Sequence, residues 1–476
     1  MWRLADDPQP LREFRNRAAA IEATRIAKGS HRLFSEYSEK KSVCVIDWDQ
    51  SEPNGTVPGE VINIAGLAAL PIPQVRILFA PRDTPIPERV FTLAELFTRY
   101  DVPSAFIAEG LNHVSQSFGI RVDSNGTEYV WFHFLCKDVE VSKDSGPRRI
   151  VDPANTFQDQ ANFTWTKSGF VLKIEDQSNN VPTQSHPSTN NSESSITLAS
   201  GGKQVTLLCF GAPASLYSHL KRLKEIMSSN DLKSDPYILL DIVLEEMYML
   251  MDNVGWVIGD IFGEIETRTL GNVSKLGIIG KEINFTGLHN LAKHTIYLRE
   301  NCESALATLE GLYAHHTRVF GEHPTAQPGA TRRSLEYRKT MFQSTQRRLE
   351  SLDKRMTNIL QLSFHLVAQR DSQSMKTIAV MTLIFMPLGT VAAIFGTQLI
   401  KLKDEEPYHM VLSRDFWLIW AIAVPLTILV VFIWRVWYRD AKARVIERST
   451  GFEGWNNLMK RFERTPNGKN KEEHIA

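Results

Sequence analysis

Two segments close to the C-terminal end of the chain are apolar almost without interruption. The first, 378–395, lies between Lys376 and the polar pair Thr397-Gln398, and the second, 416–434, contains no charged residue. Each is close to the roughly 20 residues that a helix needs to cross a hydrocarbon layer about 30 Å thick. The pattern therefore predicts two membrane helices, and a pair of buried core helices is the alternative.

Aromatic residues bracket the second segment. They are Trp417 and Trp420 at one end and Trp434, Trp437 and Tyr438 at the other. Such side chains are enriched where a membrane helix meets the aqueous interface. We therefore predict membrane helices at 377–398 and 416–438, with a short external loop at 399–415.

A third apolar stretch, 237–262, is not predicted to cross a membrane. Its acidic residues are Asp241, Glu245, Glu246, Asp252 and Asp260. Each would cost roughly 2.5–3.5 kcal/mol at a bilayer centre, so the stretch is predicted to be a soluble amphipathic helix. Asp241, Glu245 and Asp252 fall near one face of it. We interpret that face as solvated.

The first half of the chain alternates short apolar runs with helix signals. Runs rich in Val, Ile and aromatic residues predict strands at 43–46, 75–79, 129–136, 170–174 and 205–210. The capping-box pattern Thr92-Leu-Ala-Glu95 predicts the start of a helix that ends near Tyr100, and a second helix is expected at 104–114. The Ser-, Asn-, Thr- and Pro-containing stretch 176–202 is predicted to be a mobile loop.

Beyond Gly211 the pattern is helical. Helices are predicted at 214–227, 236–267 and 288–319, followed by a break at 321–329. From 334 to 386 there is neither glycine nor proline, and apolar residues recur at steps of three, four and seven: Phe342, Leu349, Leu352, Met356, Ile359 and Leu366. This predicts one helix of roughly 80 Å that continues into the first membrane helix. Its apolar stripe needs partner helices, from the same chain or from other subunits.

These elements predict a membrane protein whose N-terminal body is α/β. The expected parts upstream of the membrane are an extension at 1–42, an α/β domain at 43–211, a helical region at 212–333 and a stalk helix at 334–376. A basic tail at 439–476 follows the second membrane helix.

Charge distribution sets the expected orientation. Arg435, Arg439, Lys442, Arg444 and Arg448 follow the second membrane helix, whereas the loop at 399–415 carries mixed charges. The positive-inside rule therefore places both termini in the cytosol, with the plasma membrane as the expected location. Sequons at Asn54, Asn162 and Asn284 are then expected to stay unmodified. The 54 basic and 54 acidic residues balance, so charge gives no indication of nucleic-acid binding.

The chain shows no sign of being an enzyme. Its four cysteines, Cys44, Cys136, Cys209 and Cys302, form no CxxC pair, which favours reduced thiols in a cytosolic body. It contains no nucleotide-binding glycine motif, zinc-protease motif or nucleophile elbow.

The first membrane helix carries a resemblance to a known family. Residues 374–388, Ser-Met-Lys-Thr-Ile-Ala-Val-Met-Thr-Leu-Ile-Phe-Met-Pro-Leu, and 393–398, Ala-Ile-Phe-Gly-Thr-Gln, resemble the stalk and first membrane helix of CorA-type divalent cation transporters. The layout of a body, a long helix, two C-terminal spans and a basic tail is similar as well.

The resemblance implies a funnel-shaped homopentamer in a lipid bilayer, with the first membrane helix lining a central pore. Matched position by position, the pore-facing residues would be Ser372, Met375, Ile378, Met386, Gly389 and Gln398. Met375 and Ile378 would form an apolar constriction that gates by steric closure and dewetting. Mg²⁺ or another divalent cation would be the transported ion, with a regulatory role as a further expectation and no covalently bound cofactor.

One departure leaves two functions open. The family's outer Gly-Met-Asn is replaced by Gly396-Thr397-Gln398. Mg²⁺ loses its water reluctantly, so this outer amide is expected to hold the hydrated ion, and Gln398 keeps an amide displaced by one methylene. Passive transport of divalent cations, with Mg²⁺ as the first candidate, is the first hypothesis, and the altered tripeptide leaves a relaxed or altered ion preference open. The alternative is a non-conducting, CorA-derived membrane scaffold or metal-sensing protein.

Two smaller clusters have their own alternatives. Asp404, Glu405 and Glu406 could form a cation-attracting ring at the pore mouth, although the nearby Lys401 and Lys403 weaken the attraction, and a solvated loop is the alternative. A second cluster, which has metal-binding chemistry but straddles a predicted helix end, contains His315, His316, Glu322 and His323. For this cluster we prefer an interaction of the positively charged side chains with the C-terminal end of the helix over metal binding.

Overall fold

The computed structural model describes residues 8–27, 42–48, 60–114, 116–142, 150, 163–176, 203–274, 285–402, 410–412 and 417–436. The chain forms two compact units, residues 1–363 and 364–476. The first unit holds a mixed sheet and the helices around it. The second holds both apolar helices.

A seven-stranded sheet forms the centre of the first unit, in the order β2-β1-β3-β7-β6-β5-β4. Its strands are β1 (Ser42–Trp48), β2 (Glu60–Asn63), β3 (Val75–Ala80), β4 (Ser117–Val122), β5 (Glu128–Asp138), β6 (Thr164–Asp176) and β7 (Lys203–Phe210). Neighbouring strands are antiparallel except β3 and β7, which run parallel with Val75 opposite Val205. The sheet therefore consists of two antiparallel ribbons joined by one parallel pair.

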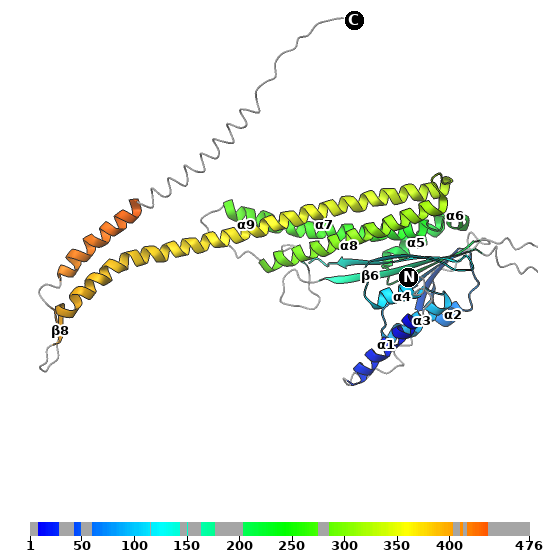
Figure 1. Ribbon diagram of the computed structural model, residues 1–476, viewed down its shortest axis with the longest axis horizontal. Helices are drawn as coiled ribbons and strands as arrows, with labels where there is room; N and C mark the ends of the chain where they lie inside the picture. The colour runs from blue at the N-terminus through cyan, green and yellow to red at the C-terminus, as the bar shows by residue number, and fades with distance from the viewer. Residues whose placement is uncertain are drawn as a thin grey trace, which may run out of the picture. The chain divides into compact units, whose positions relative to one another are not determined.

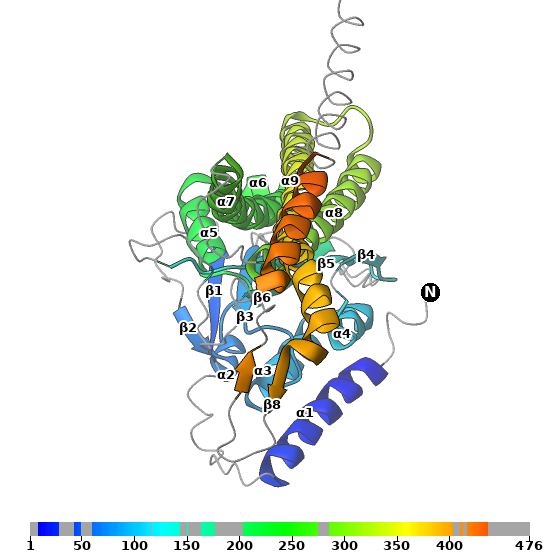
Figure 2. The ribbon, with the colours of Figure 1, turned by 90° about the vertical axis from the view of Figure 1, so that its left-hand side faces the viewer.

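Helices cover both faces of this sheet (Figure 1). They are α1 (Gln9–Ala27), α2 (Ile64–Leu67), α3 (Pro87–Arg99), α4 (Ser104–Leu111), α5 (Ala214–Ile226), α6 (Ser229–Ser234), α7 (Ile238–Ser274), α8 (Phe285–Phe320) and α9 (Ala326–Leu399). Helices α1 to α4 contribute to one hydrophobic core, and α5 to α8 with the first part of α9 contribute to the other. Figure 2 shows the same two groups of helices from the end.

The strand sequences explain the two cores. Side chains alternate between the faces of a strand. In β7, Val205, Leu207 and Cys209 therefore enter the core beneath α7 and α8, whereas Leu208 and Phe210 enter the core beneath α3 and α4. Strands that are buried on both faces are continuously apolar, which is why β5, β6 and β7 could be predicted from composition.

The five predicted strands and the main predicted helices of the body are confirmed, but five elements were missed, two of them the short helices α2 and α6. Strand β2 has only four residues, and β4 is a half-exposed edge strand with glycine at its centre. Helix α1 lies within the predicted extension and buries only Pro10, Phe14 and Ala18. Both β4 and α1 bury too little surface to give a clear apolar pattern.

The predicted capping box at Thr92 is wrong. Helix α3 begins earlier, at Pro87, after an extended Ile86 that makes no side-chain cap. Proline fits the first position of a helix because its φ is already helical and it has no N–H to satisfy. Thr92 lies buried within the helix instead, and the predicted end near Tyr100 is confirmed.

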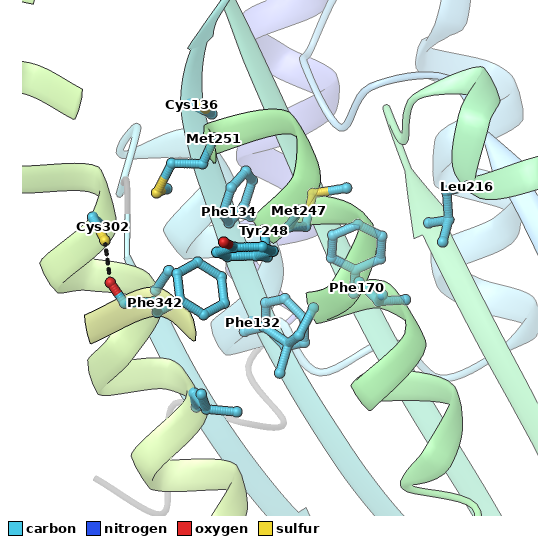
Figure 3. Packing of buried hydrophobic residues seen from close by; sticks show 14 of the residues in the cluster. Phe132, Phe134, Cys136, Phe170, Leu216, Met247, Tyr248, Met251, Cys302 and Phe342 are labelled. Carbon is cyan, nitrogen blue, oxygen red and sulfur yellow. Dashed lines mark hydrogen bonds between the residues drawn. The ribbon is translucent and has the colours of Figure 1, made fainter. Parts of the chain in front are cut away.

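Helix α9 is continuous over 74 residues, from Ala326 through Pro387 to Leu399. The predicted break at 321–329 is shorter in the structure, because α9 begins within it. The apolar stripe packs on α7 and α8 of the same chain. The rings of Phe342 and Tyr248 pack edge-on, with 5.3 Å between their centres. Cys302 donates a hydrogen bond to the Phe342 carbonyl oxygen at 3.4 Å, as Figure 3 shows. Neighbouring helices of the same chain are therefore partners of this stripe.

All four cysteines are free thiols, and Cys136, Cys209 and Cys302 are buried. Burial raises the pKa of Cys302 to about 12 and the pKa values of Cys136 and Cys209 further. Because thiolates are the reactive form, these three side chains act as small apolar groups. The predicted loop at 176–202 lies outside the described residues except for Asp176, which ends β6.

Candidate membrane pore

The second unit contains two apolar helical segments of membrane-spanning length, Met375–Ile394 and Trp417–Val436, each of 20 residues. In each segment, only 6% of the residues in the most apolar window are buried within the chain. A core helix of a soluble protein would be mostly covered, so this exposure disfavours the core-helix alternative. The two segments overlap the predicted membrane helices at 377–398 and 416–438.

One face of α9 packs on the second apolar helix. Val391 of α9 and Ala423 of the second helix are buried, with exposed fractions of 5% and 0%. A shallow apolar groove between the helices is lined by Ile384, Thr427, Ile428, Val431, Phe432 and Arg435. Positions 380, 383, 384, 387, 388 and 391 of α9, spaced by one, three and four residues, are all at least partly covered. This spacing defines one side of a helix.

The predicted pore residues lie on the opposite side of α9. Met375, Ile378 and Met386 are 68%, 62% and 71% exposed. Ser372 and Gly389 are exposed as well, and nothing lies within 4 Å of the position that a Cβ at Gly389 would take. Intervals of three and eight residues keep these positions on one face. The second helix therefore leaves uncovered the face that was predicted from the sequence to line a pore.

The outer tripeptide Gly396-Thr397-Gln398 lies in helical backbone, close to the end of α9 at Leu399. Two short strands, β8 (Ile400–Leu402) and β9 (Met410–Leu412), pair directly after it. The side chains of the tripeptide are outside the described part of the structure. Asp404, Glu405 and Glu406 also lie outside the described residues, between the two strands.

The interpretation of the α7 acids as a solvated face is wrong. Asp241 is 4% exposed and accepts a hydrogen bond of 2.6 Å from Ser334 of α9. Burial raises the pKa of Asp241, against the lowering effect of Ser334 and Arg338. Arg338 also pairs with Glu245, at 3.1 Å. These acids hold α9 against α7.

Asp252 has the same function two to three turns further along α7. It accepts a hydrogen bond of 2.7 Å from Thr345 and pairs with Arg348, both of α9. The Arg348 guanidinium lies 4.2 Å from the centre of the Trp256 ring. Side chains from a helix 90 or more residues away supply these partners, so the charges are neutralised within the subunit.

The histidines near the end of α8 bind carboxylates of other elements. His315 Nε2 lies 2.5 Å from Glu128 Oε1 of β5, and the Tyr237 hydroxyl donates to the same oxygen at 2.9 Å. His316 Nε2 lies 3.0 Å from Asp235 Oδ2, and both side chains are fully buried. The prediction of an interaction with the helix terminus is therefore wrong for these two residues. Across the described residues, no three His, Cys, Asp or Glu side chains are arranged to hold a metal.

A serine, a histidine and an aspartate also meet, in the other core. His133 Nδ1 lies 3.0 Å from Ser117 Oγ, and His133 Nε2 lies 3.1 Å from Asp83 Oδ2. Glu109 approaches Nδ1 at 3.4 Å. Although burial opposes it, the two carboxylates raise the pKa of His133. The carboxylate contacts favour the imidazolium, which cannot accept a proton from Ser117, so we interpret the arrangement as an ionic clamp rather than a catalytic triad.

Comparison with known families matches residues 189–435 to the model of the CorA-like Mg2+ transporter protein family. This segment covers more than half of the chain and includes α5 to α9 and both apolar helices. The chain belongs to the CorA-like family. The family is one of transporters rather than enzymes, and with its two apolar helices this CorA-like chain is an integral membrane protein.

Individual relatives are distant. Among curated proteins, the CorA-like chain is 28% identical over 160 residues to the "Notoamide biosynthesis cluster protein M'" of Aspergillus versicolor, which is 30% of this chain and 35% of that protein. The alignment thus spans about a third of that relative.

Among solved structures, the chain matches the complete CorA magnesium transporter of Methanocaldococcus jannaschii. It is 14% identical with a TM-score of 0.46, and the match covers 83% of this chain and 97% of that one. The full-length CmaX protein gives 12% identity and a TM-score of 0.45, over 83% and 96% of the two chains.

Proposed function

We propose that the chain is one subunit of a homopentameric channel that passes divalent cations down their electrochemical gradient, with Mg²⁺ as the first candidate. Membership in the CorA-like family supports transport in general. The observation that carries the proposal for this chain is the uncovered face of α9. It belongs to a helix that runs without a break from the body into the membrane segment.

The uncovered face fits a pore better than a lipid surface at three positions. Ser372 is polar, Gly389 has no side chain, and Met386 is a flexible thioether on an otherwise exposed side. Copies of α9 arranged around an axis would bury this face, with the second helix outside. Met375 and Ile378 would then form an apolar ring at which water is excluded when the gate is closed.

Ion choice would lie with the outer tripeptide. The amides of Gln398 would present a ring of oxygens to a hydrated cation, and Thr397 would add hydroxyls. Asp404, Glu405 and Glu406 would raise the local cation concentration at low ionic strength. In this proposal both termini are cytosolic, the membrane is the plasma membrane, and divalent cations also regulate the gate.

The test is ion flux through the full-length protein in liposomes that contain a Mg²⁺-sensitive dye. We expect flux above that of empty vesicles. Met386→Cys, on the proposed pore face, should lose flux after treatment with a charged thiol reagent. The matched variant Ile384→Cys, on the same helix but facing the second helix, should not. Flux at the level of empty vesicles, or equal block of both variants, would contradict the proposal.

A second candidate function is a non-conducting scaffold, which the altered tripeptide favours. The pair of substitutions Thr397→Met and Gln398→Asn restores the family's outer signature. If the wild-type chain is inert and this variant conducts, the scaffold is supported. If both conduct with different ion preferences, the channel is supported and its selectivity lies at the tripeptide.

A further inference from the structure

A lysine lies inside an aromatic cage where β5 ends against α8. Lys137 exposes none of its surface. Its Nζ lies 3.8 Å from the ring centre of Phe163, 4.2 Å from that of Tyr297 and 5.0 Å from that of Trp165. The same nitrogen lies 3.0 Å from His294 Nδ1. Sheet residues and α8 residues therefore surround one amine.

The ionisable groups around Lys137 give its charge little compensation. On α8 these are His294, Tyr297 and Lys293, and on β5 the next residue, Asp138, is exposed. Within the described residues no carboxylate forms an ion pair with Lys137. Burial, with a smaller effect from the like charge of Lys293, lowers the pKa of Lys137 to about 8. The ring faces favour the ammonium and offset part of this cost.

The cage adjoins the contact between α8 and α9. One residue beyond His294, the Thr295 hydroxyl lies 3.4 Å from the sulfur of Met356 of α9, and both side chains are buried. Met356 is seven residues before Ser363, the last residue of the first unit. A structural change at the cage would therefore occur close to the part of α9 that precedes the end of the first unit at Ser363.

We propose that Lys137 and its aromatic cage form a proton-operated catch between the sheet and α8. Deprotonation of the amine favours the closed state, and protonation favours an open state in which the ammonium reaches water. An exposed lysine has a pKa of about 10.4. Between the two pKa values the open state binds more protons than the closed one, so raising the pH favours closure. With a closed-state pKa of about 8, the open fraction is expected to fall about tenfold from pH 7 to pH 9.

Amide hydrogen exchange on the full-length protein in detergent tests the catch. After correction for the pH dependence of intrinsic exchange, protection of residues 285–298 should rise about tenfold from pH 7 to pH 9 in the wild-type protein. Residues 247–258 of α7, which contain no group that titrates in this range, serve as the internal control. Lys137→Met keeps the apolar stem without a charge. It should be well protected at pH 7 and show no pH dependence.

The wild-type titration decides the proposal even if the variant fails to fold. Protection of 285–298 that is flat with pH, or that falls as pH rises, would overturn the catch, because the cage would then stabilise the ammonium fully. The same holds if Lys137→Met retains the wild-type pH dependence. Should the proposed transport also hold, the catch would link it to cytosolic pH. The exchange experiment needs no flux, so either proposal can fail alone.

Discussion

His133 ties four segments of the body together through one imidazole ring. The ring comes from β5 and contacts Asp83 before α3, Glu109 of α4 and Ser117 of β4. The side chains of His133 and Asp83 are 0% and 3% exposed. Removing one partner of a buried pair leaves an uncompensated charge, which costs about 3–5 kcal/mol. His133→Gln is therefore expected to lower the unfolding free energy by about that amount, measured by denaturant titration in detergent.

The control and the pH dependence make this prediction specific. His219→Gln removes a histidine that lies 3.4 Å from Glu246 but is 29% exposed, so its cost should stay below about 1 kcal/mol. Because folding raises the pKa of His133 and lowers that of Asp83, the clamp contributes fully between the unfolded pKa values of about 3.9 and about 6.5. The difference between wild-type protein and His133→Gln should shrink as pH rises through the folded-state pKa. A difference that grows with pH would contradict the clamp.

Partners of individual charges could not be predicted from the sequence. Ser334 is 93 positions from Asp241, and His133 is 50 positions from Asp83. No local pattern relates such residues, because the fold alone brings them together. A signal did exist in β5, whose run Glu-Tyr-Val-Trp-Phe-His-Phe-Leu-Cys-Lys-Asp places His133 and Lys137 inside an apolar strand. An ionisable residue in such a strand must find compensation in the core.

At the scale of elements, the seating of α9 on α7 and α8 rests on a few large apolar side chains. Phe342 is fully buried, whereas Tyr337, on the same helix, is 60% exposed. Phe342→Ala is expected to cost about 3–5 kcal/mol of unfolding free energy because it leaves a cavity. Tyr337→Ala should change the unfolding free energy by no more than about 0.5 kcal/mol. Equal effects in denaturant titrations would show that α9 is held elsewhere.

Elements were predictable where their sequence is strongly periodic or uniformly apolar. The stripe from Phe342 to Ile359 indicated that α9 needs partners, and β5 to β7 were recognised because both of their faces are buried. Helix α1 was missed because it buries only three residues. The start of α3 was misplaced because a capping pattern inside the helix competed with the true signal, Pro87.

At the scale of the whole molecule, the predicted orientation can be tested by labelling. Glu405→Cys, in the predicted external loop, should react in intact cells with a maleimide that cannot cross the membrane. Glu322→Cys, in the exposed turn between α8 and α9, should react only after permeabilisation. The wild-type background should be low, since three native thiols are buried. Labelling of Glu322→Cys alone in intact cells would reverse the orientation.

The membrane part of the molecule was more predictable than the chemistry of its pore. The bilayer imposes helix length, aromatic belts and charge asymmetry on the sequence. These features can therefore be recognised without knowledge of any tertiary contact. The uncovered face of α9 depends on where the second helix packs, which hydrophobicity does not reveal. Ion preference depends on the surroundings of Thr397 and Gln398, and the sequence names these side chains without placing them.

The single parallel strand pair of the described sheet has a consequence for how the chain folds. Both antiparallel ribbons can begin from strands that follow one another closely, such as β4 and β5. In contrast, Val75 and Val205 must meet across 130 positions. Closing so long a loop costs conformational entropy before it gains any contact, and non-local pairing is slow. We expect the two ribbons to form early. Pairing of β3 with β7 is then expected to be the rate-limiting step in the folding of the body.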